Sequence, residues 1–204
     1  CLVEVIQFED VEDYRDGFRE LDLKENKRMR MSHSLDLPVV NPELQNGLSI
    51  RPLTRNDIEV SSEISFEAHK ISKDYVGYRD LESLENRLAL ETRVFDNVYG
   101  RFYSEGSYLM LHNDTPVATL STVVIPCWGY EQVPWIFDIS VAPGFHNKGL
   151  GRLLMNRLLY DLTTHNFSIL GLAVTLDNYS AIHLYESVGF DFVETFSEFI
   201  TSPH

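Results

Sequence analysis

The stretch HNKGLGRLLM, from His146 to Met155, places two glycines one residue apart directly before a leucine-rich run. The leucines that follow recur at helical spacing, which predicts a helix over about 149–165. Before it, residues 135–141 alternate in the way of a strand. First-turn N–H groups of a helix lack partners, and glycine has no Cβ to hold a phosphate away. This order predicts an anion site, and a glycine-rich helix start without a ligand is the alternative.

Periodicity along the rest of the chain indicates an α+β protein with a mixed sheet. Strands are expected over 28–37, 48–53, 107–111, 117–125, 135–141, 168–175 and 190–200. Helices are expected over 57–71, 81–95, 149–165 and 178–188. On the strand before the glycines, one face is expected to carry Trp135, Phe137, Ile139 and Val141, and the other Ile136, Asp138 and Ser140. A breaker-rich connection over 38–47 predicts an N-terminal extension, 1–46, and a main domain, 47–204.

Composition excludes several classes of partner and site. Seventeen basic and thirty-one acidic residues give a formal charge of −14, which disfavours nucleic acid and anionic membrane. Only two cysteines are present and they lack metal-ligand spacing, so no metal site is expected. No apolar run approaches the roughly 18 residues of a membrane span. We expect a cytoplasmic protein, and a homodimer stays open as its assembly.

Two stretches resemble the signatures of one enzyme family. Residues 141–151, VAPGFHNKGLG, resemble the acetyl-coenzyme A motif V-x-P-x-x-[Q/R]-x-x-G-x-[G/A] of the GNAT superfamily of N-acetyltransferases. Residues 172–190, LAVTLDNYSAIHLYESVGF, resemble its second signature, a strand followed by N-x-x-A-x-x-L-Y-x-x-x-G-F. The resemblance covers about 47–200. It implies the GNAT fold, with a mostly antiparallel sheet, and acetyl-coenzyme A as co-substrate.

The resemblance also implies which residues bind the co-substrate. Main-chain amides over 147–151, helped by Lys148 or Arg152, are expected to hold the pyrophosphate. His146 stands where the family usually has glutamine or arginine, so side-chain help at that position is expected to be weaker. The co-substrate residues expected are Ile139, Ser140, Val141, His146, Asn147, Lys148, Gly149, Leu150, Gly151, Arg152, Asn178 and Tyr185.

Catalytic roles follow from the same resemblance. Tyr185 is expected to protonate the departing thiolate of coenzyme A, and a core tyrosine is its alternative. Asn178 is expected near the pantetheine arm and is also suited to cap a helix. Asp138 is the expected base for the acceptor amine, with Glu131 or a water chain as alternatives. Amides over 139–141 are expected to polarise the thioester carbonyl.

The function implied is transfer of an acetyl group from acetyl-coenzyme A to a primary amine by direct attack in a ternary complex. A non-catalytic acyl-coenzyme A binding module and an enzyme that uses a longer acyl donor are the alternatives. The small-molecule or peptide acceptor is expected to contact the first two helices of the main domain and their connection, where His69, Tyr75, Tyr78 and Arg79 lie. A role in packing is the alternative for these aromatic residues.

The N-terminal extension carries a faint echo of the second signature. Residues 14–18, YRDGF, followed by a strand, are similar to residues 185–190 and the strand after them. This similarity suggests the tail of a preceding similar domain whose strand packs against this one. An added β-hairpin is the plainer alternative.

Overall fold

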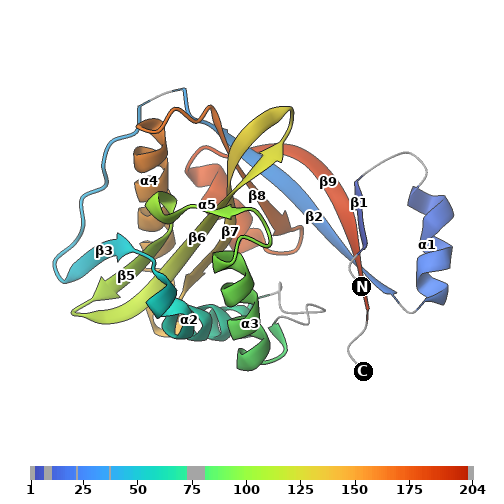
Figure 1. The fold of residues 1–204 in the computed structure, drawn as a ribbon, viewed down its shortest axis with the longest axis horizontal. Helices are drawn as coiled ribbons and strands as arrows, with labels where there is room; N and C mark the ends of the chain where they lie inside the picture. The colour runs from blue at the N-terminus through green and yellow to red at the C-terminus, as the bar shows by residue number, and fades with distance from the viewer. Residues whose placement is uncertain (1–2, 7–10, 22, 37, 73–80, 202–204) are drawn as a thin grey trace.

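The computed structural model describes residues 3–6, 11–21, 23–36, 38–72 and 81–201 (Figure 1). The strands in this part of the chain form one mixed sheet in the order β1-β9-β2-β8-β7-β6-β5-β3, and β4 pairs with β6. Their bounds are β1 Val3–Ile6, β2 Leu23–Ser34, β3 Leu48–Pro52, β4 Arg101–Phe102, β5 Tyr108–His112, β6 Thr115–Cys127, β7 Tyr130–Val141, β8 Ile169–Thr175 and β9 Asp191–Thr201. All pairs are antiparallel except β7 with β8, which confirms the predicted fold class.

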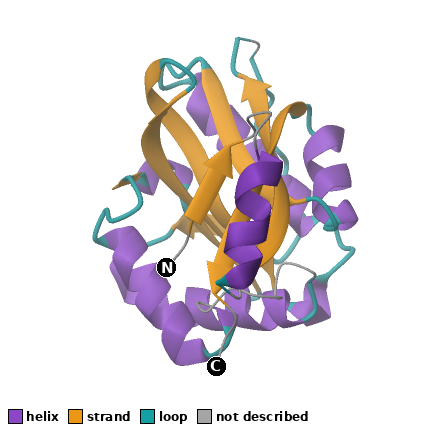
Figure 2. Cartoon of the chain, turned by 90° about the vertical axis from the view of Figure 1, so that its right-hand side faces the viewer, coloured by secondary structure: helices purple, strands orange, loops and turns teal. Residues whose placement is uncertain are grey.

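Helices lie on both sides of this sheet, as the turned view in Figure 2 shows. Their bounds are α1 Val11–Glu20, α2 Ile58–Lys70, α3 Leu84–Phe95, α4 Leu150–Thr163 and α5 Tyr179–Ser187. The second helix of the main domain begins three residues later than predicted, because Ser83 caps it by accepting the Asn86 N–H at 3.1 Å. The short strand β4 was not predicted.

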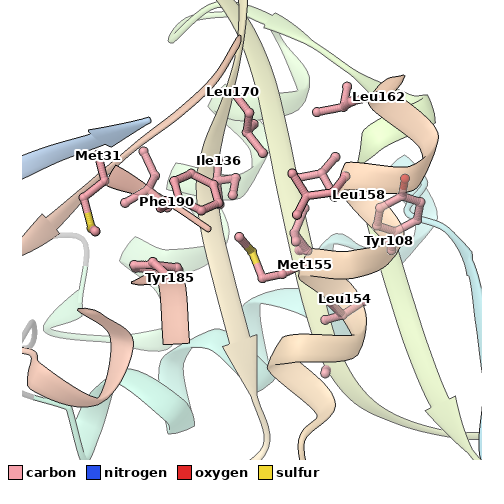
Figure 3. Close-up of a cluster of buried hydrophobic side chains, with 14 of the residues drawn as sticks. Met31, Tyr108, Ile136, Leu154, Met155, Leu158, Leu162, Leu170, Tyr185 and Phe190 are labelled. Atoms are coloured by element: carbon pink, nitrogen blue, oxygen red, sulfur yellow. The ribbon is translucent and has the colours of Figure 1, made fainter. Parts of the chain in front are cut away.

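Alternate residues of β5 show how the two faces of the sheet differ. Tyr108 and Met110 belong to the large apolar core under α4 and α5, whereas Leu109 faces α2 in a small second cluster with Leu53 and Ile64. Figure 3 shows the large core, in which Leu154, Met155, Leu158 and Leu162 of α4 face Ile136, Leu170 and Phe190. The α2 face is much more polar, and the candidate site lies on it and at the end of β7.

Two strands of the N-terminal extension belong to the sheet, β2 in its interior and β1 at its edge. β2 lies between β8 and β9 and pairs with both, and β1 pairs with the other edge of β9. β1 and β2 are therefore separated by β9, which differs from a hairpin. Met31 of β2 is 1% exposed and belongs to the large core. The predicted strand over 28–37 is confirmed in type, but it begins earlier, at Leu23.

Candidate functional site

The parallel strands β7 and β8 separate beside the predicted site. They pair through Trp135 with Gly171 and through Ile136 with Leu172. β8 pairs with β2 on its other edge over Ile169–Thr175, and β7 continues along β6 to Val141. In the described part of the chain, no strand pairs with the β8-facing edge of β7 beyond Ile136. The sheet therefore opens where an extended ligand could add main-chain hydrogen bonds to that edge.

A β-bulge at Phe137 marks the same point. Ser121 of β6 is opposite Asp138, but the next residue, Thr122, is opposite Ile136. The extra residue changes the facing of everything after it. Phe137 contacts Tyr99 just beyond α3, with ring centroids 5.2 Å apart. The bulge and the contact with Tyr99 place Phe137 on the same face of the sheet as Asp138.

The predicted alternation of β7 was therefore wrong beyond Ile136. Ile139 and Val141 pack against the large core under α4, on the side of Ile136 rather than on that of Phe137. Asp138 and Ser140 face α2 and α3. The bulge thus gives the open end of β7 an apolar side toward α4 and a polar side toward the first two helices.

Glycine at position 149 is required by the backbone at the start of α4. Gly149 has φ +76°, a left-handed conformation that disfavours other residues, and nothing lies within 4 Å of a Cβ built there. The first main-chain bond of the helix is donated by Leu153 to the Gly149 carbonyl. The N–H groups of Leu150, Gly151 and Arg152 precede that bond and so have no helical acceptor. Open space beside these amides suits a diphosphate.

Gly151 has a different neighbourhood from Gly149. A Cβ at Gly151 would lie 3.1 Å from Cδ2 of Leu184 in α5. The second glycine of the motif therefore allows α4 and α5 to pack closely, a reason that the sequence did not reveal. The anion-site interpretation rests on the amide of Gly151 and on the open space at Gly149.

Side chains of the glycine turn are largely engaged with the protein. His146 Nε2 lies 2.6 Å from the Val141 carbonyl, which can only accept, so Nε2 carries the hydrogen. The Lys148 ammonium lies 4.5 Å from the centroid of the Phe145 ring. Lys148 and Arg152 are exposed. The loop thus offers two cations at its rim and a histidine that fixes the turn to the end of β7.

Tyr185 and Asn178 lie on α5, which follows β8. Tyr185 is 7% exposed and belongs to the large core, with its ring centroid 5.9 Å from that of Phe190 (Figure 3). Asn178 caps the helix, since its Oδ1 accepts the Ala181 N–H at 3.3 Å. Both side chains therefore have structural roles of the kind that the sequence offered as alternatives, and these roles are compatible with the roles implied by the resemblance.

Asp138 is buried in a network of charges. Its Oδ2 lies 3.2 Å from the guanidinium of Arg87 and accepts a bond from Ser140 at 3.0 Å, and its Oδ1 lies 3.5 Å from His69 Nε2. Burial alone would raise the pKa of Asp138, but Arg87, His69 and the hydroxyl donors outweigh burial and lower it. Asp138 is thus held as a carboxylate.

Arg87 and Glu91, both on α3, were not among the predicted site residues. Arg87 also pairs with Glu91 at 2.9 Å, and their side chains are 4% and 1% exposed. Burial raises the pKa of Glu91, and the neighbouring Asp138 adds to this effect. The sequence did carry a signal, because both charges share the buried helix face of Leu90 and Val94 at i, i+3, i+4 and i+7 spacing.

The other predicted candidates are not gathered at this point. Glu131 is exposed and lies seven residues before Asp138 on β7, about 20 Å away along the strand. Tyr75, Tyr78 and Arg79 lie outside the described residues. His69, near the end of α2, is the one acceptor-side candidate that the structure places beside Asp138.

Two other kinds of site are absent from the described residues. No group of three or more His, Cys, Asp or Glu side chains there is arranged to hold a metal ion. No helix in the same residues has the length and apolar character needed to cross a membrane.

Comparisons with known proteins agree with this geometry. Spermidine N(1)-acetyltransferase of Vibrio cholerae is 28% identical over 152 residues, which are 72% of this chain and 80% of that protein. Ribosomal protein bS18-alanine N-acetyltransferase of Salmonella typhimurium is 45% identical over 56 residues, 28% of this chain and 38% of that protein. A crystal structure of a GCN5-related N-acetyltransferase from Sphaerobacter thermophilus matches 98% of this chain and 59% of its own, with a TM-score of 0.63 at 15% identity.

The family model described as the Acetyltransferase (GNAT) family matches residues 74–190. That range contains the bulge of β7, the glycine turn before α4 and the helix that carries Tyr185. It covers more than half of the chain, and the family generally uses acetyl-coenzyme A as its acetyl donor. The chain belongs to the GNAT family of acetyltransferases, and it is an N-acetyltransferase.

Proposed function

We propose that the protein transfers the acetyl group of acetyl-coenzyme A to a primary amine by direct attack in a ternary complex. The observation that carries this proposal is the open edge of β7 beyond Ile136 next to the unpartnered first-turn amides of α4. Direct attack is favoured over a covalent route because Cys127 pairs with Tyr130 at the other end of β7, away from Asp138.

Each part of the co-substrate has a matching group on the protein. The amides of residues 150–152 would hold the diphosphate, and the open edge of β7 would bond the pantetheine amides. An amide between Ile139 and Val141 would polarise the carbonyl oxygen of the acetyl group. When bound, acetyl-coenzyme A supplies an activated thioester. Tyr185 would donate its phenolic proton to the departing sulfur.

The acceptor would approach from the polar side of β7. Asp138 faces α2 and α3 there, and the acidic balance of the chain, −14, attracts a protonated amine. We assign to Asp138 the role of the carboxylate that drives removal of the amine proton. Its burial, with the side chain 7% exposed, favours action through a neighbouring group over direct contact.

The acceptor is proposed as a class only, and an amine panel tests it. One relative is named for spermidine and another for the alanine of a ribosomal protein. We therefore expect release of free coenzyme A thiol with at least one of spermidine, other polyamines, amino acids and peptides with a free N-terminus. Binding of acetyl-coenzyme A without thiol release across the panel would favour a binding module. Faster turnover with succinyl-coenzyme A would favour a longer acyl donor.

We also propose that residues 1–46 form an extension with the character of a tail from a similar domain. The order strand, helix, strand in β1-α1-β2 repeats the order in β8-α5-β9. The two units pair reciprocally, β1 with β9 and β2 with β8, while β2 and β9 pair with each other. This reciprocal pairing supports an origin of both units in the same kind of domain.

Met31→Ala tests whether the extension is part of the folded core. Met31 is fully buried, so we expect the free energy of unfolding to fall by about 2–5 kcal/mol, measured by urea denaturation. Phe192→Ala, a change at a 60% exposed residue of the neighbouring strand β9, is the control and should cost far less. Equal small losses in both variants would show that β2 packs only loosely.

A further inference from the structure

Polar side chains fill the space between α2, α3 and the sheet. This polar layer consists of residues that are all buried, on four elements: Ser61, Ser62 and Ser65 on α2, Arg87 and Glu91 on α3, Thr119 and Ser121 on β6, and Asp138 and Ser140 on β7. Burial of so many polar groups is costly unless they bond to one another or serve a function. The layer ends at the open part of β7, on the side from which the acceptor is proposed to approach.

Asp138 is the carboxylate in this layer that is held ionised. Arg87 faces it from α3, and the Ser140 hydroxyl, itself 3.3 Å from that of Ser65, donates to it. Glu91 shares Arg87, but its Oε2 is buried without a hydrogen-bond partner. An ionised group would be poorly stabilised in that position, in keeping with the raised pKa of Glu91. The raised pKa of Glu91 makes it the weaker carboxylate of the two, so Asp138 is the stronger partner for the charge of Arg87.

His69 is the member of this constellation that lies nearest the surface. Its side chain is 17% exposed, against 7% for Asp138 and 4% for Arg87. Nδ1 lies 2.8 Å from the main-chain carbonyl of Ser65, an oxygen that can only accept, so Nδ1 carries a hydrogen. In the neutral ring Nε2 therefore carries a lone pair and no hydrogen. It lies 3.5 Å from Asp138 Oδ1.

We propose that His69 is the general base of the reaction and that Asp138 acts through it. The inference rests on the proposed transfer to an amine. His69 Nε2 takes one proton from the acceptor ammonium, which leaves a neutral amine with a free electron pair. That pair forms the C–N bond as the C–S bond breaks, and Tyr185 gives its proton to the sulfur. The new amide nitrogen then loses its second proton, which returns through solvent to the Tyr185 phenolate and restores the phenol. The imidazolium formed at His69 is stabilised by Asp138 and returns its proton to solvent.

The proposed role of His69 explains why two more deeply buried charged groups, Asp138 and Arg87, follow it in one chain of contacts. The Ser65 carbonyl fixes the ring orientation and its tautomer, and Asp138 lies where the new positive charge develops. Arg87 keeps Asp138 ionised, and the contact of Arg87 with Glu91 holds the guanidinium in place. Asp138 lies on β7 and His69 on α2. The titratable or charged groups described beside this pair are Arg87 and Glu91, both on α3.

A first experiment needs no acceptor. In the full chain labelled with ¹⁵N-histidine, long-range ¹H–¹⁵N spectra report which ring nitrogen is protonated, and His69→Gln identifies the signal. We expect the neutral ring to be the Nδ1–H form. Finding the Nε2–H form would overturn the proposal, because the lone pair would then lie on Nδ1 beside the Ser65 carbonyl and Nε2 could not take a proton.

A second experiment measures the rate with an amine accepted in the panel. His69→Ala should lower kcat/KM by about 10²-fold or more, and added imidazole should restore part of the loss. Asp138→Asn should also lower kcat/KM, but added imidazole should not restore the rate, because His69 is still present in that variant. His165→Ala, at the far end of α4, is the control and should match the wild type. The thermal unfolding midpoint of His69→Ala is measured alongside to show that the variant is folded, and restoration of the rate by imidazole is a result that loss of the fold would not give.

The outcomes separate this proposal from the proposed function. Full activity of His69→Ala alongside an active wild type would overturn the role of His69 and leave acetyl transfer standing. A wild type that releases no thiol with any amine would overturn the proposed function instead. In that case the ¹H–¹⁵N spectra would still test the predicted Nδ1–H form of His69.

Discussion

Tyr185→Phe should lower kcat by about 10²- to 10⁴-fold while leaving the dissociation constant of acetyl-coenzyme A almost unchanged. The substitution removes one oxygen and keeps the ring that packs beside Phe190 in the core. A thiolate that leaves without a proton donor is a poorer leaving group, so the loss belongs to the chemical step. Stopped-flow detection of free thiol gives kcat, and calorimetry gives the dissociation constant.

Tyr103→Phe is the matched control for this prediction. Tyr103 is 6% exposed and lies in the same core, so its loss of a hydroxyl imposes a similar change on packing. We expect its kcat to stay near the wild-type value. A Tyr185→Phe enzyme that keeps kcat within about threefold would show that Tyr185 is a core residue and that another group protonates the sulfur.

Gly149→Asp should weaken binding of acetyl-coenzyme A by about 10²-fold or more, because two unit charges 4 Å apart interact with about 4 kcal/mol near a protein surface. The new carboxylate would stand at the N-cap of α4, where it would accept the first-turn amides that the diphosphate needs. Aspartate tolerates left-handed backbone better than most residues, so the fold should survive. Calorimetric titration measures the loss.

The chain offers a close control for this variant. Gly129, in the turn between β6 and β7, has φ +81° and likewise has nothing within 4 Å of an added Cβ. Gly129→Asp thus adds the same charge and the same backbone strain away from α4, and its affinity should equal that of the wild type. Gly149→Asn, which caps without a charge, should fall between the two. Equal affinities for all three variants would place the diphosphate elsewhere.

Local patterns in the sequence were sufficient for most elements of the fold. The leucine period predicted α4, and the strand expected over 168–175 is found as β8. The cap at Asn178 could also be predicted, because it depends on residues a few positions away.

The features that were missed depend on contacts between distant segments. A bulge has no composition of its own, so the alternation of β7 gave the wrong facing after Phe137. Arg87 is buried because Asp138, some fifty positions later, compensates its charge. The similarity of residues 14–18 to residues 185–190 suggested that the strand of the extension packs against this domain, but its position between β8 and β9 depends on pairing between opposite ends of the chain. No local pattern contains that information.

Hydrogen exchange with and without acetyl-coenzyme A tests the central claim most directly. If the first-turn amides of α4 hold the diphosphate, then Leu150, Gly151 and Arg152 should become protected on binding, together with amides on the open edge of β7 over 138–141. Protection confined to other segments, or exchange at these amides that is unchanged at saturating acetyl-coenzyme A, would contradict the account.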